Sequence, residues 1–216
     1  MKENKVWFAS DFHYGHVNIC GGTTQWVDHG TTRDFDTVEE MNITILKSIN
    51  DVVAEDDELY FLGDWSFGGI RNIWNFRKQI ICNNIHFIPG NHDNNIIKNK
   101  PLPNCHWELF DDEIVDGVWR AADEFVFAQE LFLMHPKIKE LIYKDQKFIL
   151  SHYPLEQWED MDKGSIHLHG HVHHTLDGSD TNMFFKRMDV GWEGKIYSAD
   201  DIIAEMNKKE NKTHIK

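Results

Sequence analysis

Short apolar runs recur along the first half of the chain, and each ends abruptly in polar residues. The runs at 5–10, 59–65 and 85–88 are too short for core helices and end at or near Ser, Asp, Gly or Pro, so each reads as a buried strand. In the last of them a Pro-Gly pair precedes Asn91, which is a turn signal. The pattern predicts strands whose ends lead into polar loops.

Two segments between these strands have the spacing of amphipathic helices. In 35–58 the apolar residues that recur at this spacing are Val38, Met41, Ile45, Ile49 and Val52. Thr37, with Glu40 three residues later, forms a capping box at the start of this helix. A second helix is predicted in 70–80, with a mixed apolar face of Ile70, Ile73, Trp74, Arg77 and Ile80. The alternation of strands and helices predicts an α/β domain whose sheet is covered on both faces.

The second half of the chain is harder to interpret. We predict that 94–136 is an excursion over the sheet and not a second domain, because it is short and lacks linker composition. Two strands are expected in 139–150, and a further strand in 166–174 breaks at Gly170. A final short helix starts at Ser198, and the charged tail 207–216 is expected to fray. Residues 1–216 are therefore predicted to form a single domain.

Composition narrows the class of protein. A chain of 216 residues with 41% hydrophobic and 12% aromatic residues is globular. No apolar stretch approaches the length of a membrane span, and the first apolar run begins too early for a signal peptide. Cys20, Cys82 and Cys105 are odd in number and widely spaced, which suits unpaired thiols in a reducing compartment. We expect a cytoplasmic protein with no membrane partner.

The charge of the chain limits its partners. The formal net charge is -14, with 36 acidic and 22 basic residues, so we expect no stable binding to long duplex nucleic acid. A phosphate group could still be bound if metal cations supplied the positive charge. The 14 histidines make that possibility important.

Five predicted strand ends carry groups that bind metals or transfer protons. They are D-F-H at 11–13, G-D at 63–64, G-N-H-D at 90–93, S-H at 151–152 and G-H-V-H at 170–173. Ligands collect at strand ends in open α/β sheets because the connecting loops converge there. We therefore expect these five segments to build one site.

Paired spacing within two of these segments indicates metal binding. Asp11 and His13 are two residues apart, as are His171 and His173, and in extended chain such residues point to one side. Carboxylate, amide and imidazole donors together suit Mn, Fe, Zn or Ni. We expect two divalent ions, with Mn²⁺ as the first choice and Fe, Zn, Ni or Mg as alternatives.

The ordered set of motifs resembles that of the calcineurin-like metallophosphoesterase superfamily. It is most similar to small bacterial and phage phosphoesterases whose first motif reads D-x-H-x-G-H-x-N, here 11–18, and the resemblance extends from Val6 to about Trp192. The resemblance implies a two-sheet β-sandwich flanked by helices, in α-β-β-α layers, with the site at the strand ends.

The resemblance also implies roles for individual residues. The ligands of the first metal would be Asp11, His13, Asp64 and His173. Asp64 would bridge to a second metal, whose other ligands would be Asn91, His152 and His171. His92 would be the general acid beside the leaving group, with Asp93 fixing its orientation. His16 and Asn18, close to the first motif, are candidates for contacts with substrate.

The implied reaction is hydrolysis of a phosphate ester, most naturally a phosphodiester of a small nucleotide. A hydroxide bridging the two metals would attack phosphorus and His92 would protonate the leaving oxygen. The open alternatives are a phosphomonoesterase, a nuclease for short single strands, and a metal-binding interaction module without activity. Many phosphoprotein phosphatases of the superfamily continue G-D with Asp-Arg-Gly, whereas 63–68 reads G-D-W-S-F-G here. That departure weighs against a protein phosphatase, and we expect Trp65 and Phe67 to pack.

Overall fold

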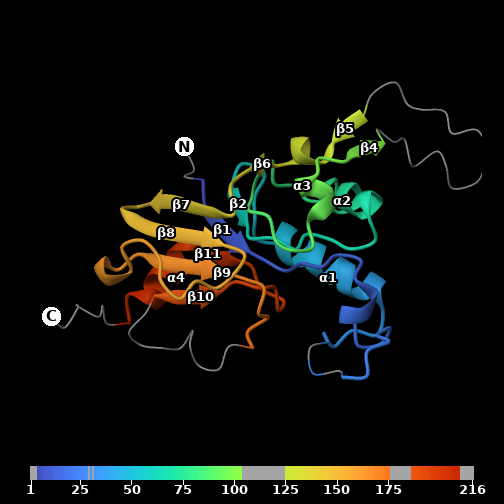
Figure 1. The fold of residues 1–216 in the computed structure, drawn as a ribbon, viewed down its shortest axis with the longest axis horizontal. Coiled ribbons are helices and arrows are strands. Elements are labelled where there is room, and N and C mark those ends of the chain that lie inside the picture. Colours follow the sequence, from blue (N-terminus) through green and yellow to red (C-terminus); the bar gives the residue numbers. More distant parts are fainter. Residues whose placement is uncertain (1–3, 29, 31, 104–124, 176–185, 210–216) are drawn as a thin grey trace, which may run out of the picture.

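Two mixed β-sheets form the centre of the molecule, which a computed structural model describes for residues 4–28, 30, 32–103, 125–175 and 186–209 (Figure 1). The first sheet has the strand order β11-β1-β2-β3-β6. Its strands are β1 (Val6–Ala9), β2 (Glu58–Phe61), β3 (Asn84–Phe87), β6 (Leu133–Met134) and β11 (Tyr197–Ser198). All neighbours are parallel except β11, which pairs antiparallel with β1.

The second sheet has the strand order β10-β9-β8-β7. Its strands are β7 (Ile138–Tyr143), β8 (Gln146–Ser151), β9 (Ile166–His169) and β10 (Arg187–Asp189). The two strands predicted in 139–150 are confirmed as the antiparallel hairpin of β7 and β8, and the strand that breaks at Gly170 is confirmed as β9. A separate two-stranded sheet pairs β4 (Pro101–Pro103) with β5 (Phe125–Phe127).

The predicted helices form where the capping signals placed them. Thr37 caps the first helix, and its hydroxyl accepts the Glu40 N–H at 3.1 Å. Ser198 caps the last helix in the same way through the Asp201 N–H. The α-helices are α1 (Val38–Asn50), α2 (Ile70–Arg77), α3 (Asn94–Ile97) and α4 (Ala199–Met206). Short 3₁₀ turns are η1 (Val17–Ile19), η3 (Ala128–Leu131) and η4 (Met161–Lys163).

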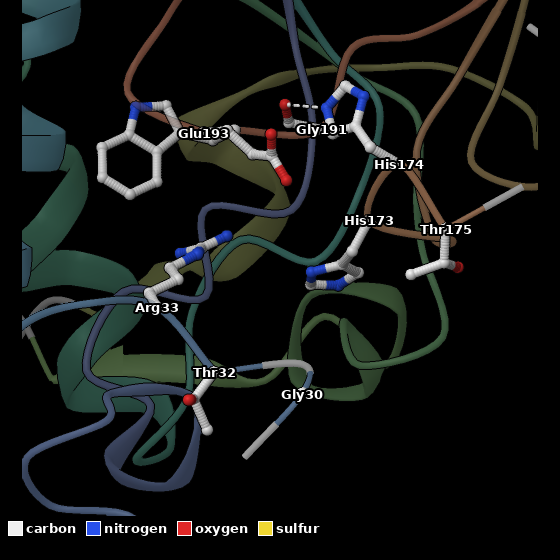
Figure 2. A pocket seen from close by; sticks show the side chains of 9 residues that line it. Gly30, Thr32, Arg33, His173, His174, Thr175, Gly191 and Glu193 are labelled. Carbon is white, nitrogen blue, oxygen red and sulfur yellow. Dashed lines mark hydrogen bonds between the residues drawn. The ribbon is translucent and has the colours of Figure 1, made fainter.

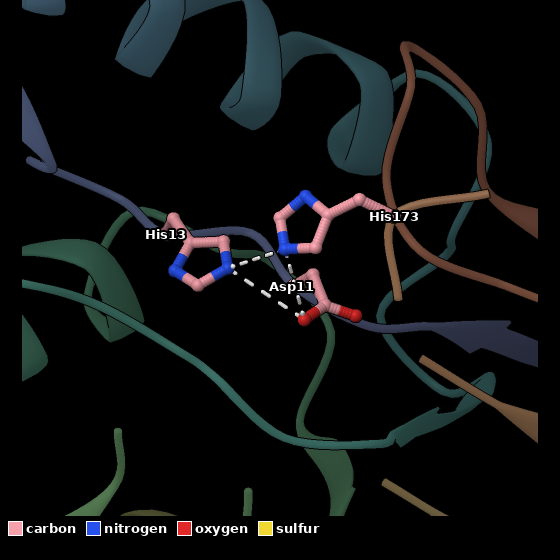
Figure 3. A group of neighbouring side chains, drawn as sticks. All are labelled: Asp11, His13 and His173. Carbon is pink, nitrogen blue, oxygen red and sulfur yellow. Dashed lines mark hydrogen bonds and ion pairs between the residues drawn. The ribbon is translucent and has the colours of Figure 1, made fainter. Parts of the chain in front are cut away.

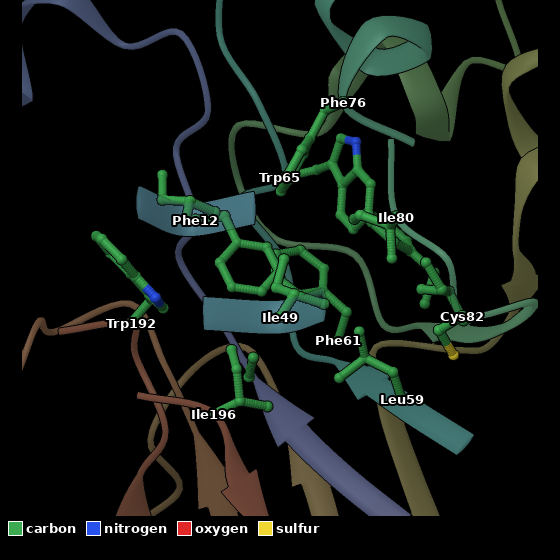
Figure 4. Packing of buried hydrophobic residues seen from close by; sticks show 14 of the residues in the cluster. Phe12, Ile49, Leu59, Phe61, Trp65, Phe76, Ile80, Cys82, Trp192 and Ile196 are labelled. Atoms are coloured by element: carbon green, nitrogen blue, oxygen red, sulfur yellow. The ribbon is translucent and has the colours of Figure 1, made fainter. Parts of the chain in front are cut away.

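One hydrophobic cluster joins α1 and α2 to the first sheet. Met41, Ile45 and Ile49 of α1 are fully buried in it, and Figure 4 shows Phe61, Trp65 and Phe76 packed within the same cluster. Trp65 therefore packs, as expected from the sequence.

The helix faces differ from the prediction at their C-terminal ends. α1 ends at Asn50, so Val52 lies beyond it with 44% of its surface exposed. α2 ends at Arg77, and the residues it buries are Ile73 and Phe76. Of the predicted face, Ile73 and Ile80 are buried and Ile70 and Trp74 pack against the same cluster, whereas the buried Phe76 was not predicted.

A second cluster fills the space between the two sheets. Successive residues of a strand face opposite sides, so Phe8 and Tyr60 of the first sheet point toward Phe148 and Leu168 of the second. α4 adds Ile202 and Met206, among others, to this cluster and contacts β1 and β11. In Figure 1, α1 and α2 lie on the far side of the first sheet from the β7–β10 sheet.

Several predictions fall partly on residues outside the described ranges. In 94–136 the described residues leave the first sheet through α3 and β4 and rejoin it at β6; residues 104–124, with Cys105, lie outside the described part. The same holds for 210–216 of the predicted tail. Cys20 and Cys82 are buried free thiols. No helix among the described residues is long and apolar enough to cross a membrane.

Candidate metal centre

Loops from both sheets converge at one edge. Ala9, Phe61 and Phe87 are in register on the parallel strands β1, β2 and β3, so the loops that follow them start level with one another. The Asp11 N–H donates to the Gly63 carbonyl at 2.9 Å, which ties the first two loops together. On the second sheet, the Gly170 N–H donates to the His152 carbonyl at 3.0 Å. The candidate ligands are carried on these loops.

Most of the predicted ligands have a left-handed backbone. The residues with this conformation are Asp11 (φ 54°), His13 (φ 51°), Asp64 (φ 63°), His171 (φ 70°) and His173 (φ 47°). The expectation of extended chain is therefore wrong for both pairs, Asp11 with His13 and His171 with His173, although Asp11 and His13 still bring their side chains to one side. A left-handed conformation is costly for a residue with a side chain, and such strain gathers at functional sites.

Glycines in the motifs permit close approach of the loops. Gly63 has φ +94°, and a Cβ there would lie 2.6 Å from the Cα of Gly90. A Cβ on Gly170 would lie 2.1 Å from the Asp11 Oδ2 atom. A larger residue at either position would push the loops apart, so the glycines of G-D and G-H-V-H are required by packing.

Asp11, His13 and His173 form the first group of potential ligands (Figure 3). The Nε2 atoms of the two histidines are 3.1 Å apart, and each lies 3.6 Å from Asp11 Oδ1. Two ligands bound to one ion at about 2.1 Å are about 3.0 Å apart at a right angle and about 3.4 Å apart at a tetrahedral angle. The triangle is therefore close to one face of a coordination shell. Asp11 Oδ1 is buried and has no hydrogen-bond partner, as expected of a free ligand atom.

Asp11, Asp64 and His152 form the second group. His152 Nδ1 donates to the Leu62 carbonyl at 2.8 Å, which leaves the Nε2 lone pair facing the site. That Nε2 atom lies 3.5 Å from Asp64 Oδ2 and 2.9 Å from the side-chain oxygen of Asn91. Two acceptor atoms this close suit ligands that share a cation.

His171 is less closely integrated than the other predicted ligands. Its backbone N–H donates to Asp11 Oδ2 at 2.9 Å, whereas its ring is exposed and packs near the rings of His152 and Tyr153. The ring belongs to neither ligand group. The structure thus brings six of the seven predicted ligands into contact and leaves the His171 imidazole beside them.

His92 has an exposed side chain near Asp64, whereas the Asp93 carboxylate is buried and binds backbone N–H groups. His92 Nε2 is 4.0 Å from Asp64 Oδ2, and its side chain is 46% exposed and packs on Phe67. The buried Asp93 carboxylate accepts the N–H groups of Gly90, Asp64 and Trp65 at 2.7, 2.8 and 2.9 Å. These hydrogen bonds hold the Asp64 loop, whereas the sequence suggested that Asp93 orients the His92 ring.

The two predicted substrate contacts have local partners. His16 Nδ1 accepts the Ile19 N–H at 3.0 Å, and its ring packs against Phe67 at 3.8 Å between centroids. The Asn18 side-chain oxygen accepts the Gln25 N–H at 3.2 Å. The His16 ring lies 5.7 Å from the His13 ring between centroids, while Asn18 shapes the following loop.

Burial dominates the electrostatics of these side chains. It raises the pKa of Asp64 to about 8, opposed by the His92 N–H and reinforced by Asp93 and Asp11. Burial lowers the pKa of His13 to about 3 in spite of the neighbouring Asp11 carboxylate, which acts to raise it. It also acts to raise the pKa of Asp11, but His13, His152 and His173 bring that pKa below its usual value. Neutral imidazoles beside crowded carboxylates are the state that binds a cation.

Sequence reasoning missed two residues beside the first group. The buried Asp189 carboxylate accepts the N–H groups of Gly191 and His174 at 2.7 and 2.8 Å and so fixes the turn next to His173. Asp189 ends the short strand β10, which was not predicted, so the strand-end signal that marked the other sites was not available. Arg33 and His173 line a pocket of about 100 Å³ (Figure 2). Nothing in the local pattern around Arg33 indicated this placement.

The chain is similar in sequence to a phage protein and to an archaeal protein. No protein-family model matches the chain. The Gene 66 protein of Mycobacterium phage L5 is 26% identical over 94% of this chain and 95% of its own length. Uncharacterized protein MJ1445 of Methanocaldococcus jannaschii is 35% identical over 43% of this chain, and the match spans about half of that relative, 49%.

A solved structure extends this similarity to the backbone. The protein of unknown function AQ665 from Aquifex aeolicus superposes with a TM-score of 0.60 at 20% identity, over 94% of this chain and 100% of that one. At this identity the likeness concerns the fold alone.

Proposed function

We propose that the protein is a binuclear-metal-dependent phosphoesterase of the calcineurin-like type. The observation that carries the proposal is the pair of ligand groups that share Asp11, one with His13 and His173 and the other with Asp64 and His152. Two overlapping groups of buried donors suit two neighbouring ions better than one. The proposed four-layer sandwich and the proposed superfamily rest on the five sequence motifs that carry these ligands.

Asp64 is the proposed bridging ligand. Its Oδ2 atom lies 3.8 Å from His13 Nε2 and 3.5 Å from His152 Nε2, so it reaches one histidine of each group. Asn91, through its contact with His152, would complete the second set. The buried, unpartnered oxygen of Asp11 and the mixed O and N donors fit Mn²⁺ and the other ions named above.

Bound divalent ions would supply activation of water and stabilisation of charge on phosphate oxygens. His92 would donate a proton to the leaving oxygen, because its exposed imidazole lies 4.0 Å from Asp64 Oδ2. Burial lowers the pKa of His92 in the free protein, and a bound phosphate anion would raise that pKa again by favouring the charged ring. Phe67, packed between His16 and His92, would keep both rings in place.

A small nucleotide diester is the proposed substrate. The formal charge of -14 disfavours extended nucleic acid, while two dications opposed by two aspartates leave a locally positive site for one phosphate. The test is a panel in which the Mn²⁺-loaded protein is offered cyclic nucleotides, linear dinucleotides and nucleoside monophosphates. We expect hydrolysis of at least one diester to exceed that of every monoester. Cleavage of monoesters alone would make the protein a phosphomonoesterase, and no cleavage with both ions bound would refute the proposal.

A further inference from the structure

Arg33 is a partly buried cation that contacts the first ligand loop, residues 11–13. Its Nη1 atom donates to the Phe12 carbonyl at 2.7 Å, and its Nη2 atom donates to the Asp11 carbonyl at 2.5 Å. The guanidinium carbon lies 4.8 Å above the ring of Trp192. Arg33 is separated from these partners by more than twenty residues in sequence, so the contact is made by the fold.

Both ends of the Arg33 side chain are fixed. Its backbone N–H donates to the Ile19 carbonyl at 2.7 Å, and its carbonyl accepts the Gly21 N–H at 2.8 Å. Beneath the guanidinium, the Trp192 indole donates to the Ser48 hydroxyl of α1 at 2.8 Å. The cation is therefore held between the helix layer and the ligand loop.

The loop that Arg33 contacts needs external support. Asp11 and His13 are both left-handed, and Phe12 between them is fully buried in the hydrophobic cluster. The N–H groups of Asp11 and His13 are bound by the Gly63 and Asp64 carbonyls at 2.9 and 3.1 Å. Arg33 binds the Asp11 and Phe12 carbonyls, and the His13 carbonyl accepts the His16 N–H at 3.0 Å.

We infer that Arg33 is a positioning residue for the metal centre, which clamps the 11–13 loop so that Asp11 and His13 present their ligand atoms together. The inference rests on the metal centre of the proposed function but does not require that the protein hydrolyses phosphate esters. Two adjacent carbonyls match the planar fork of a guanidinium, and a lysine ammonium cannot bind both with the same geometry. Groups that orient ligands from behind typically change metal affinity by about 10–100-fold when removed.

The test compares Arg33→Lys with Arg77→Lys. Arg77 is a matched control because its guanidinium also donates to main-chain carbonyls, those of Leu131, Ile80 and Asn83, outside the ligand loops. Both variants keep the positive charge, so altered repulsion of the metal cannot explain a difference. Thermal unfolding and Mn²⁺ binding by calorimetry are measured on the full chain.

We expect both variants to lose some thermal stability and only Arg33→Lys to bind Mn²⁺ about 10–100-fold more weakly. Equal Mn²⁺ affinity of Arg33→Lys and wild type would overturn the inference while leaving the proposed function intact. Failure of wild type to bind any of Mn²⁺, Fe²⁺, Zn²⁺, Ni²⁺ and Mg²⁺ would instead refute the metal centre itself.

A second measurement avoids the variant if Arg33→Lys does not fold. In ¹⁵N,¹³C-labelled wild-type protein, with the arginine side-chain signals assigned by through-bond correlation from the backbone, the guanidinium signals of Arg33 should shift on addition of Zn²⁺ and those of Arg77 should not. Unchanged Arg33 signals in protein shown to have bound Zn²⁺ would overturn the inference, because they would show that metal binding does not affect Arg33.

Discussion

The carboxylate of Asp64 approaches the Nε2 atom of His152 to 3.5 Å, although the two residues follow strands of different sheets. The other oxygen of Asp64 accepts the His92 N–H at 2.9 Å. This carboxylate therefore contacts ligands of both groups and the backbone of His92, the proposed acid. Its replacement should affect metal binding and folding differently.

Asp64→Asn should remove metal binding without unfolding the protein. Burial raises the pKa of Asp64 to about 8 in the metal-free protein, so at pH 7 the side chain is mainly a neutral acid that asparagine closely resembles. We expect metal content well below wild type and near-zero hydrolysis, with the melting temperature of the metal-free form little changed. Metal analysis and thermal unfolding test this, and full occupancy by two ions in the variant would refute the bridge.

Asp93→Asn should behave in the opposite way and destabilise the metal-free fold. Asparagine offers one oxygen where the Asp93 carboxylate accepts three buried N–H groups, and each unpaired group costs about 1–3 kcal/mol. Denaturant unfolding of metal-free protein measures the loss. The control is Asp160→Asn, which removes a partly exposed partner of Lys147 and Lys163 and should cost much less. Equal stability of the two variants would show that the Asp93 hydrogen bonds are not needed.

His92→Ala should separate metal binding from proton donation. Both ions should remain bound, because His92 belongs to neither ligand group. Loss of a general acid typically costs about 10²–10⁴-fold in rate, and the cost depends on the leaving group. We expect severe loss on nucleotide diesters, whose ribose alkoxide needs a proton, and much smaller loss on bis-nitrophenyl phosphate. Equal losses on both substrates would assign proton donation to another group, with His16 as the next candidate.

Long duplex DNA should not form a stable complex with the protein, even at low ionic strength. The expectation follows from the formal net charge of -14 and from the dependence of such complexes on neutralised phosphates. A gel-shift titration across salt concentrations measures it. A tight complex that weakens steeply with salt would favour a nuclease.

Local signals were sufficient for much of the fold. α1 followed from its apolar spacing and the Thr37 cap, and β1, β2 and β3 followed from short apolar runs. β10 and β11 are only three and two residues long, and each exists because of a neighbouring strand distant in sequence. No local pattern could reveal them.

The site was predictable in its residues and not in its backbone. Donor residues at five strand ends indicated where Asp11, His152 and His173 would meet. The left-handed conformation of Asp11 and His13 was not foreseen, because hydrogen bonds from the Gly63–Asp64 loop impose it. The Asp93 contacts and the Arg33 clamp are likewise made between segments distant in sequence.

Titration of the metal-free protein with Mn²⁺ addresses the binuclear centre and its chemistry together. Bound ions per chain and hydrolysis of bis-nitrophenyl phosphate are recorded on the same samples. We expect no hydrolysis without metal, and a rate that rises with occupancy and saturates at two ions per chain. Saturation at a single ion, hydrolysis that persists in chelator, or two bound ions without hydrolysis would each contradict a binuclear phosphoesterase.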